Sequence, residues 1–310
     1  MEFMNSIYEI ITANIQNDGT LPDDFMIQTK HEKFAPGAMD GILIYHTENL
    51  GTGGVPKDET AEKIVDLLKQ YFKSENHQFI NEIESILADE SAISLVDLIL
   101  SRLSAQQKDI DANSMVANTL NLLETSHDCE LVKIGIALLG LFDFGGNEEI
   151  IEFIKTFAAY DEFTLYVVVA ASGWTNGNVI IFEIVKKVNG WGKVHAVERL
   201  EPENDEIRDW ILREGCLNGV LPAYLGLTCA EKGDLISALR QETLDDELFD
   251  GVSIIIEALL DEGPVAGISA YDHAAEALKL YLHHAEQIGK SNVNKDTVKE
   301  IKKLLSKYNK

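Results

Sequence analysis

Apolar positions along most of the chain recur with the period of an α-helix. In the segment DETAEKIVDLLKQYF, which begins at Asp58, apolar residues stand at i, i+3, i+4 and i+7, namely Ile64, Leu67, Leu68 and Tyr71. The same kind of pattern predicts further helices at about 76–88, 92–104, 112–125 and 129–142. No long run of β-type alternation interrupts this succession. The pattern therefore predicts an all-α fold.

A unit of about 30 residues repeats in the middle of the chain. Candidate helix N-caps recur at intervals of 29, 28 and 30 residues, at Asn147, Asn176, Asn204 and Asp234. An Asn or Asp side chain at such a position accepts hydrogen bonds from the free N–H groups of the first helical turn. An aromatic residue follows each of the first three caps by six positions, as Phe153, Phe182 and Trp210. The spacing predicts two helices per unit, with a short or shifted second helix in the fourth.

This period and the two-helix unit resemble those of the HEAT and armadillo-like α-solenoids. The stretch VHAVERL-x-PENDEIRDWIL, from residue 194 to 212, is the most similar to that pattern, and the resemblance covers roughly residues 129–242. Repeats of this kind bury their faces by stacking, which produces a continuous curved surface. The resemblance implies an α-solenoid of HEAT-like helix pairs.

Proline and glycine divide the chain into three segments. Three of the six prolines and a glycine cluster at 51–54 fall within residues 1–57, which predicts a small irregular segment packed on the body. It begins with a short helix at about 2–16, and its apolar stretch 42–46 is expected to be a strand or a packed extended segment. Residues 58–242 hold the HEAT-like repeats. Residues 243–310 hold closing helices near 244–261 and 271–287, then a basic helix from about 294.

The charge of the chain favours a basic partner. Acidic residues outnumber basic ones 52 to 26, for a formal net charge of −26, so the surface should repel nucleic acid. We expect instead a protein or peptide partner with basic character, bound by association that weakens as salt rises. The segment 290–310 carries seven Lys, which predicts either a solvated basic helix face or a face that docks on an acidic surface.

Cysteine usage and hydropathy indicate a cytoplasmic protein. Cys129, Cys216 and Cys229 form no CxxC pair, so neither a disulfide framework nor a zinc ribbon is indicated. The uncharged stretch at 134–142 is too short to span a bilayer, and the N-terminus lacks the basic region of a signal peptide. We expect no membrane association.

Motifs for cofactors and metals are absent from the sequence. The glycine-rich loop NLGTGGVPK at 49–57 satisfies neither phosphate-binding fingerprint, and its proline removes a backbone donor. The His and Glu residues of the helix around 271–286 lack the HExxH spacing and fit its solvent side. We therefore expect no metal and no cofactor.

Large aromatic and arginine side chains are the candidates for recognition. Trp174 and Trp191 are expected in loops that flank one helix of the array, and Arg208, Asp209 and Arg213 on the next second helix. Such residues commonly act as anchors of protein interfaces. The leading hypothesis is a binding or adaptor module whose second helices line a concave face.

Two segments carry another resemblance. FAPGAMDGILIYH at 34–46 and WILREGCLNG at 210–219 resemble a family of bacterial proteins that carry the name limonene hydroxylase. That name implies a terpene monooxygenase, yet the sequence shows no haem-thiolate signature, dinucleotide fingerprint or evident iron triad.

The resemblance leaves an enzyme as the alternative hypothesis. Its apolar small-molecule site would lie where the N-terminal segment packs on the array, with Asp40 and His46 as candidate catalytic residues and Arg213 nearby. A third hypothesis is an acidic immunity-type protein that neutralises a basic toxin.

Overall fold

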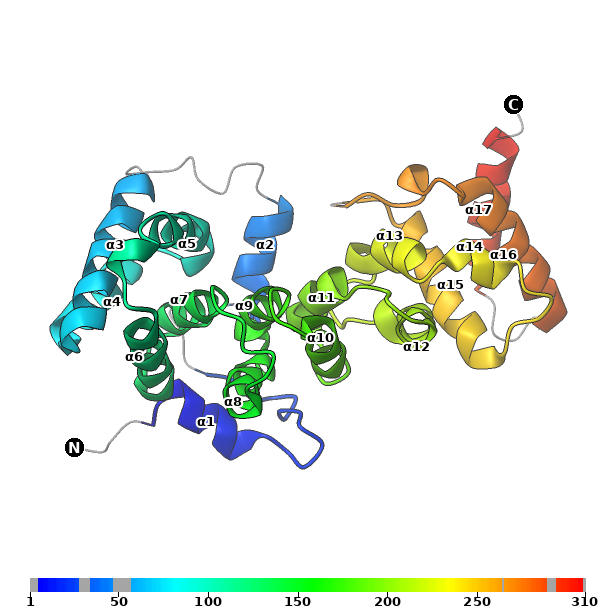
Figure 1. The fold of residues 1–310 in the computed structure, drawn as a ribbon. Helices are drawn as coiled ribbons and strands as arrows, with labels where there is room; N and C mark the ends of the chain where they lie inside the picture. The colour runs from blue at the N-terminus through cyan, green and yellow to red at the C-terminus, as the bar shows by residue number, and fades with distance from the viewer. Residues whose placement is uncertain (1–4, 28–33, 47–56, 264, 289–293, 309–310) are drawn as a thin grey trace. The chain divides into compact units, whose positions relative to one another are not determined.

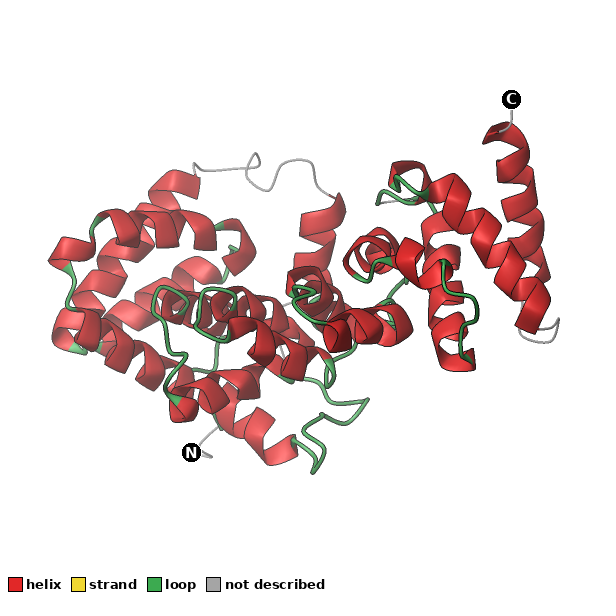
Figure 2. Cartoon of the chain, turned by 45° about the vertical axis from the view of Figure 1, so that its right-hand side comes forward, coloured by secondary structure: helices red, strands yellow, loops and turns green. Residues whose placement is uncertain are grey.

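The protein is all-α, as the hydrophobic pattern predicts. The computed structural model describes residues 5–27, 34–46, 57–263, 265–288 and 294–308, and these residues form helices and no strand (Figure 2). The glycine-rich loop, whose residues 49–56 precede Lys57, lies outside the described residues, as do Lys290 and Lys310 of the basic tail.

The helices divide into two compact units, residues 1–199 and 200–310. The division falls inside the stretch 58–242 that the sequence pattern groups together. Unit 1 contains α1 (Ile7–Asn14), α2 (Ala38–His46), α3 (Lys57–Ser74), α4 (His77–Leu87), α5 (Val96–Ala105), α6 (Ala112–Thr125), α7 (Cys129–Leu139), α8 (Glu148–Ala158), α9 (Asp161–Ala171), α10 (Gly177–Val185) and α11 (Gly190–Arg199) (Figure 1). Two 3₁₀ turns, η1 (Ala92–Ser94) and η2 (Gln107–Asp109), flank α5.

The core of unit 1 is formed by helices α7, α9 and α11. Helix α9 packs against both α7 and α11, and every residue of α7 is buried. A helix that is buried on all sides needs other helices to cover it, and α4, α5 and α6 cover α7 together with α9. Helices α8 and α10, which follow α7 and α9 in the chain, keep an exposed face.

The predicted helix caps are confirmed at three of the four positions. The side chains of Asn147, Asn204 and Asp234 accept from the N–H groups of Ile150, Ile207 and Ser237, respectively. The Asn176 side chain makes no cap hydrogen bond; its backbone is left-handed, with φ 63°, as is that of Asp234, with φ 55°.

The N-terminal segment contributes two helices. Helix α1 packs on α6 and α8, and the backbone N–H of Ile7 donates to the carbonyl of Ser126 at 2.9 Å. The expected strand or extended segment at 42–46 is wrong, because these residues form the last part of α2. A short apolar run does not distinguish strand from helix, and Asp40 in the first turn favours the helix through its interaction with the helix dipole.

Unit 2 contains the remaining helices, α12 (Asp205–Trp210), α13 (Ala223–Lys232), α14 (Leu235–Leu239), α15 (Asp246–Leu260), α16 (Ala274–Ile288) and α17 (Lys295–Tyr308), with a π-helical turn η3 (Ile211–Gly215) and a 3₁₀ turn η4 (Ile268–Ala270). Helix α15 packs on α13 and η3, and α16 packs on α14 and α17. The predicted closing helices and basic helix are present as α15, α16 and α17. The short second helix expected in the fourth repeat is α14, which has five residues.

Candidate functional site

A surface pocket of about 560 Å³ lies beside helix α8 in unit 1. Three helices supply its walls: Tyr8 comes from α1, Leu120 and Glu124 from α6, and Glu149, Ile150 and Phe153 from α8. Tyr8 precedes the other lining residues by more than 100 positions in the chain, and the packing of α1 on α6 and α8 brings them together.

Aromatic rings form the apolar wall of this pocket. The ring centroids of Tyr8 and Phe153 are 4.6 Å apart, with an angle of 41° between the ring planes. Phe157, one turn further along α8, is buried behind them, with its centroid 5.7 Å from that of Tyr8. Because Phe157 is fully buried, it holds the two half-exposed rings in place.

Glutamate side chains give the pocket its negative charge. Glu124 and Glu149 are exposed and form no ion pair with any of the described residues. Glu152 also lines the pocket, but its carboxylate lies 2.7 Å from Nζ of Lys155. None of the described residues that line the pocket is Lys or Arg. The site therefore combines an aromatic wall with at least two uncompensated carboxylates.

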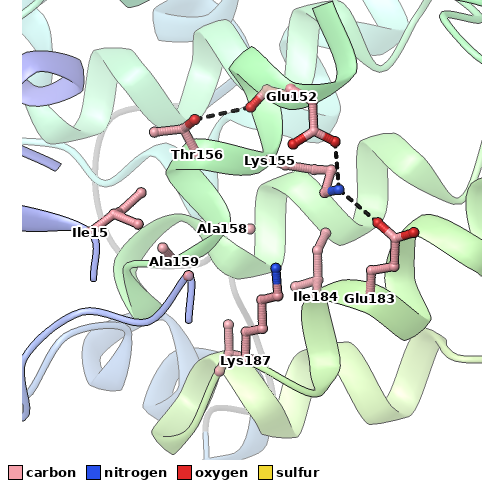
Figure 3. Close-up of a pocket in the computed structure, with 11 residues that line it drawn as sticks. Ile15, Glu152, Lys155, Thr156, Ala158, Ala159, Glu183, Ile184 and Lys187 are labelled. Carbon is pink, nitrogen blue, oxygen red and sulfur yellow. Dashed lines mark hydrogen bonds and ion pairs between the residues drawn. The ribbon is translucent and has the colours of Figure 1, made fainter. Parts of the chain in front are cut away.

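A second, smaller pocket of about 250 Å³ lies next along α8 and shares Glu152 and Thr156 with the first. Figure 3 shows Lys155 between Glu152 of α8 and Glu183 of α10, with 2.7 Å from its Nζ to each carboxylate. Lys155 is thus engaged on this side of the helix and leaves the carboxylates of Glu124 and Glu149 available to a ligand.

A separate cluster of charged side chains is buried inside unit 1. Its centre is Lys133 of α7, whose side chain has no exposed surface. Its Nζ lies 3.0 Å from Asp40 of α2, 3.1 Å from Glu130 of α7 and 2.5 Å from Glu162 of α9. Buried charges are tolerated only when they are paired in this way. Lys133 therefore joins three helices at one point.

Further hydrogen bonds extend this buried cluster. Glu130 accepts from the backbone N–H of Ala92 at 2.6 Å, and Glu162 accepts from that of Gly37 at 2.7 Å. Tyr166 donates its hydroxyl to Asp40 at 2.9 Å. Burial raises the pKa of Asp40, and the Lys133 ammonium opposes that rise. The cluster fixes α2 and η1 to the core, so its role is structural.

The structure separates the two catalytic candidates. Asp40 belongs to the buried cluster and is 2% exposed, whereas His46 is exposed at the C-terminal end of α2. Six residues along a helix correspond to about 600° of rotation, so the two side chains leave α2 in different directions. Arg213, the third residue of the enzyme hypothesis, belongs to unit 2.

Both tryptophan candidates are buried. Trp174, in the turn between α9 and α10, is 5% exposed, and Trp191 is 6% exposed. The expected loop position of Trp191 is wrong, because it is the second residue of α11. Its ring contacts Gly41 of α2 so closely that a Cβ there would overlap the ring, and it stacks on Tyr45 at a centroid distance of 5.8 Å.

The polar candidates of unit 2 form ion pairs among themselves and with neighbours. The guanidinium of Arg213 donates to Asp209 at 2.8 Å and to both carboxylate oxygens of Asp245 at 2.6 and 2.9 Å. Arg208 pairs with Asp205 at 2.9 Å. One stretch of α12 and η3 thus contains Arg208, Asp209 and Arg213. The ion pair of Arg213 with Asp245 links this stretch to the start of α15.

The pocket beside α8 is not predicted by the sequence pattern. Phe153 stands out only as a repeat position, and no motif marks Tyr8, Glu124 or Glu149. The signal present in the sequence was the acidic pair before an aromatic in NEEIIEF. The position of α1 on α6 and α8, which completes the pocket, has no local sequence signal.

Asp161, at the start of α9, is expected to make the stability of the protein depend on pH. Burial raises the pKa of Asp161 to about 7, although the backbone N–H groups of Gly192 and Trp191 donate to it and oppose the rise. Because the pKa of Asp161 is raised in the folded state, the contribution of this carboxyl group to the free energy of unfolding is full below about pH 4. This contribution is lost as pH rises to about 7.

Replacing Asp161→Asn should therefore flatten the pH dependence of unfolding. Between pH 4 and pH 7, the free energy of unfolding of the variant should rise by about 2 kcal/mol relative to that of the wild type. This value allows for solvent that reaches the carboxylate. Urea unfolding across this range measures the difference. A constant difference at all pH values would show that Asp161 has an ordinary pKa.

Comparisons with known proteins assign no family to the chain. The described residues contain no group of three or more His, Cys, Asp or Glu side chains placed to hold a metal ion. Among the helices of the described ranges, none has the length and apolar character needed to cross a bilayer. No family model, no curated protein and no solved structure matches the chain.

Proposed function

We propose that this protein is a binding module of stacked, HEAT-like helix pairs that takes up a basic segment of a partner protein in the pocket beside α8. The observation that carries the proposal is the composition of this pocket. Glu124 and Glu149 lie beside the Tyr8 and Phe153 rings and are exposed, and among the described residues they have no ion-pair partner and no basic side chain lines the pocket. A cationic segment would neutralise the carboxylates while its apolar atoms cover the rings.

Contacts at one-repeat spacing support the helix-pair part of the proposal. In unit 1, Asp143 accepts from the hydroxyl of Thr175, 32 residues later, and Lys155 pairs with Glu183, 28 residues later. In unit 2, Lys232 donates to the carbonyl of Leu200, again 32 residues away. Contacts between residues about one repeat apart are a feature of stacked repeats, in which each unit contacts its neighbours.

The net charge supports a basic partner. At −26 the protein attracts cationic proteins over distances of about a Debye length, which accelerates association at low salt. The three cysteines are free and buried, which suits a cytoplasmic protein in which no disulfide is needed.

The proposal predicts salt-dependent binding of basic peptides at this pocket. A fluorescently labelled peptide that alternates Arg and Lys with Gly should bind the full chain at low salt. Its affinity should fall about tenfold or more when Glu124→Lys and Glu149→Lys are combined, because two attractions become repulsions. Fluorescence anisotropy at several salt concentrations measures both effects.

The matched control places the same charge change elsewhere. Glu203→Lys combined with Glu286→Lys replaces two exposed carboxylates of unit 2 and changes the net charge equally. This control should bind the peptide with nearly unchanged affinity. Equal losses in both double variants, or an affinity that does not depend on salt, would contradict the proposed site.

A further inference from the structure

We infer that the pocket beside α8 selects arginine over lysine, so that its partner presents an arginine side chain. This inference rests on the proposed function and specifies the chemistry of its ligand. The side chains that line the pocket carry it: two ring systems in contact and two carboxylates from different helices, with no Lys or Arg among the described lining residues.

The aromatic wall favours a planar cation. Tyr8 and Phe153 are both half-exposed, and their rings are tilted by 41° to each other at a centroid distance of 4.6 Å. A guanidinium group stacks on aromatic faces and is weakly hydrated, so it loses little when it leaves water. A lysine ammonium is compact and strongly hydrated, and it gains less from the same rings.

The arrangement of the carboxylates favours a group with several donors. Glu124 projects from α6 and Glu149 from α8, so the two carboxylates reach the pocket from different walls. Guanidinium carries five N–H donors in a fixed fork and can serve two carboxylates while it lies against a ring. Leu120 and Ile150, both half-exposed, are available to the methylene stem.

Within the described ranges, no basic side chain occupies this role. Lys155, whose partners include Glu152 of the pocket, also binds Glu183 on the side of the second pocket. Glu124 and Glu149 have no ion-pair partner among the described residues. We therefore expect the ligand to supply the cation that pairs with these two carboxylates.

The position of Tyr8 is fixed by the start of its helix. The Ser6 side chain and the Glu9 side chain form a reciprocal capping box at the N-terminus of α1. The N–H of Ile7 donates to Ser126 at the end of α6. The ring is thus held in a defined place before a ligand arrives, which lowers the cost of ordering the site.

Two peptides of equal charge and length, one with Arg and one with Lys at every basic position, test the inference by anisotropy on the full chain. The Arg peptide should bind about five- to tenfold more tightly, since cation–π contacts of partly desolvated groups have this size. Combining Tyr8→Leu with Phe153→Leu should reduce the ratio of the two affinities to about one, with charge-driven binding retained. Tyr8→Phe, which keeps the ring, should preserve the ratio.

The outcomes separate the two proposals. Equal affinities of the wild type for both peptides would overturn the arginine inference and leave the basic-partner function standing. Failure of both peptides to bind at low salt would overturn the proposed function itself. The combined Leu variant could still prefer arginine while its helix content and unfolding midpoint are unchanged. That result would show that the two rings do not determine the preference for arginine.

Discussion

Replacing Lys133→Met should lower the free energy of unfolding by about 3–5 kcal/mol, because removing one partner of a buried ion pair leaves uncompensated charge in the interior. Three carboxylates lie within 3.1 Å of the Lys133 ammonium, and the side chain of Lys133 has no exposed surface. Met has nearly the same length, so the loss of packing is small. Urea unfolding followed by circular dichroism measures the change.

The control uses the same substitution at a lysine with two carboxylate partners at the surface. Lys155 pairs with Glu152 and Glu183, both well exposed, so Lys155→Met should cost no more than about 1 kcal/mol.

A second variant separates charge from packing at the buried site. Combining Lys133→Met with Asp40→Asn removes one of the unpaired charges, so the double variant should be more stable than Lys133→Met alone. If Lys133→Met and Lys155→Met had the same small effect, the buried cluster would not hold α2 and α9 on α7.

Replacing Gly251→Ala should destabilise unit 2 by about 1–3 kcal/mol or more, because overpacking against a backbone is relieved only by moving whole helices. A Cβ at Gly251 would lie 2.6 Å from Cα of Arg213 and would also meet the carbonyl oxygen of Leu212. These are backbone atoms of η3, against which α15 packs. The missing side chain is therefore what lets α15 approach this π-helical turn.

The matched control is Gly263→Ala in the same unit. Apart from its chain neighbours, a Cβ at Gly263 would have no described residue within 4 Å, so this substitution should change the free energy of unfolding by less than about 0.5 kcal/mol. Urea unfolding of both variants gives the comparison. If Gly251→Ala were as stable as Gly263→Ala, the close packing of α15 on η3 would be refuted.

Local sequence signals predict much of the helical organisation. The caps Asn147 and Asn204 mark the starts of α8 and α12 because capping depends on residues within one turn. The same local logic fails for residues 42–46, where a short apolar run fits either a strand or a helix. The predicted loop position of Trp191 is wrong for a related reason. Glycines on both sides of it suggest a loop, but Gly190 begins α11.

The buried cluster and the pocket depend on contacts that local patterns do not encode. Lys133 and Glu130 stand in the otherwise apolar segment CELVKIGIALL, which signals a buried charge but does not identify Asp40, 93 residues earlier, as its partner. Likewise, Tyr8 reaches Phe153 only because α1 packs on α8. Both sites require knowledge of tertiary packing, which a single sequence does not supply.

Hydrogen–deuterium exchange of the full chain, with and without a saturating Arg-rich peptide at low salt, tests the central claim most directly. We expect slower exchange in α1, at the C-terminal end of α6 and in the first two turns of α8, where Tyr8, Glu124, Glu149 and Phe153 line the pocket. Segments of unit 2 should exchange at unchanged rates. Protection confined to unit 2, or spread evenly over all acidic segments, would contradict a specific basic-ligand site beside α8.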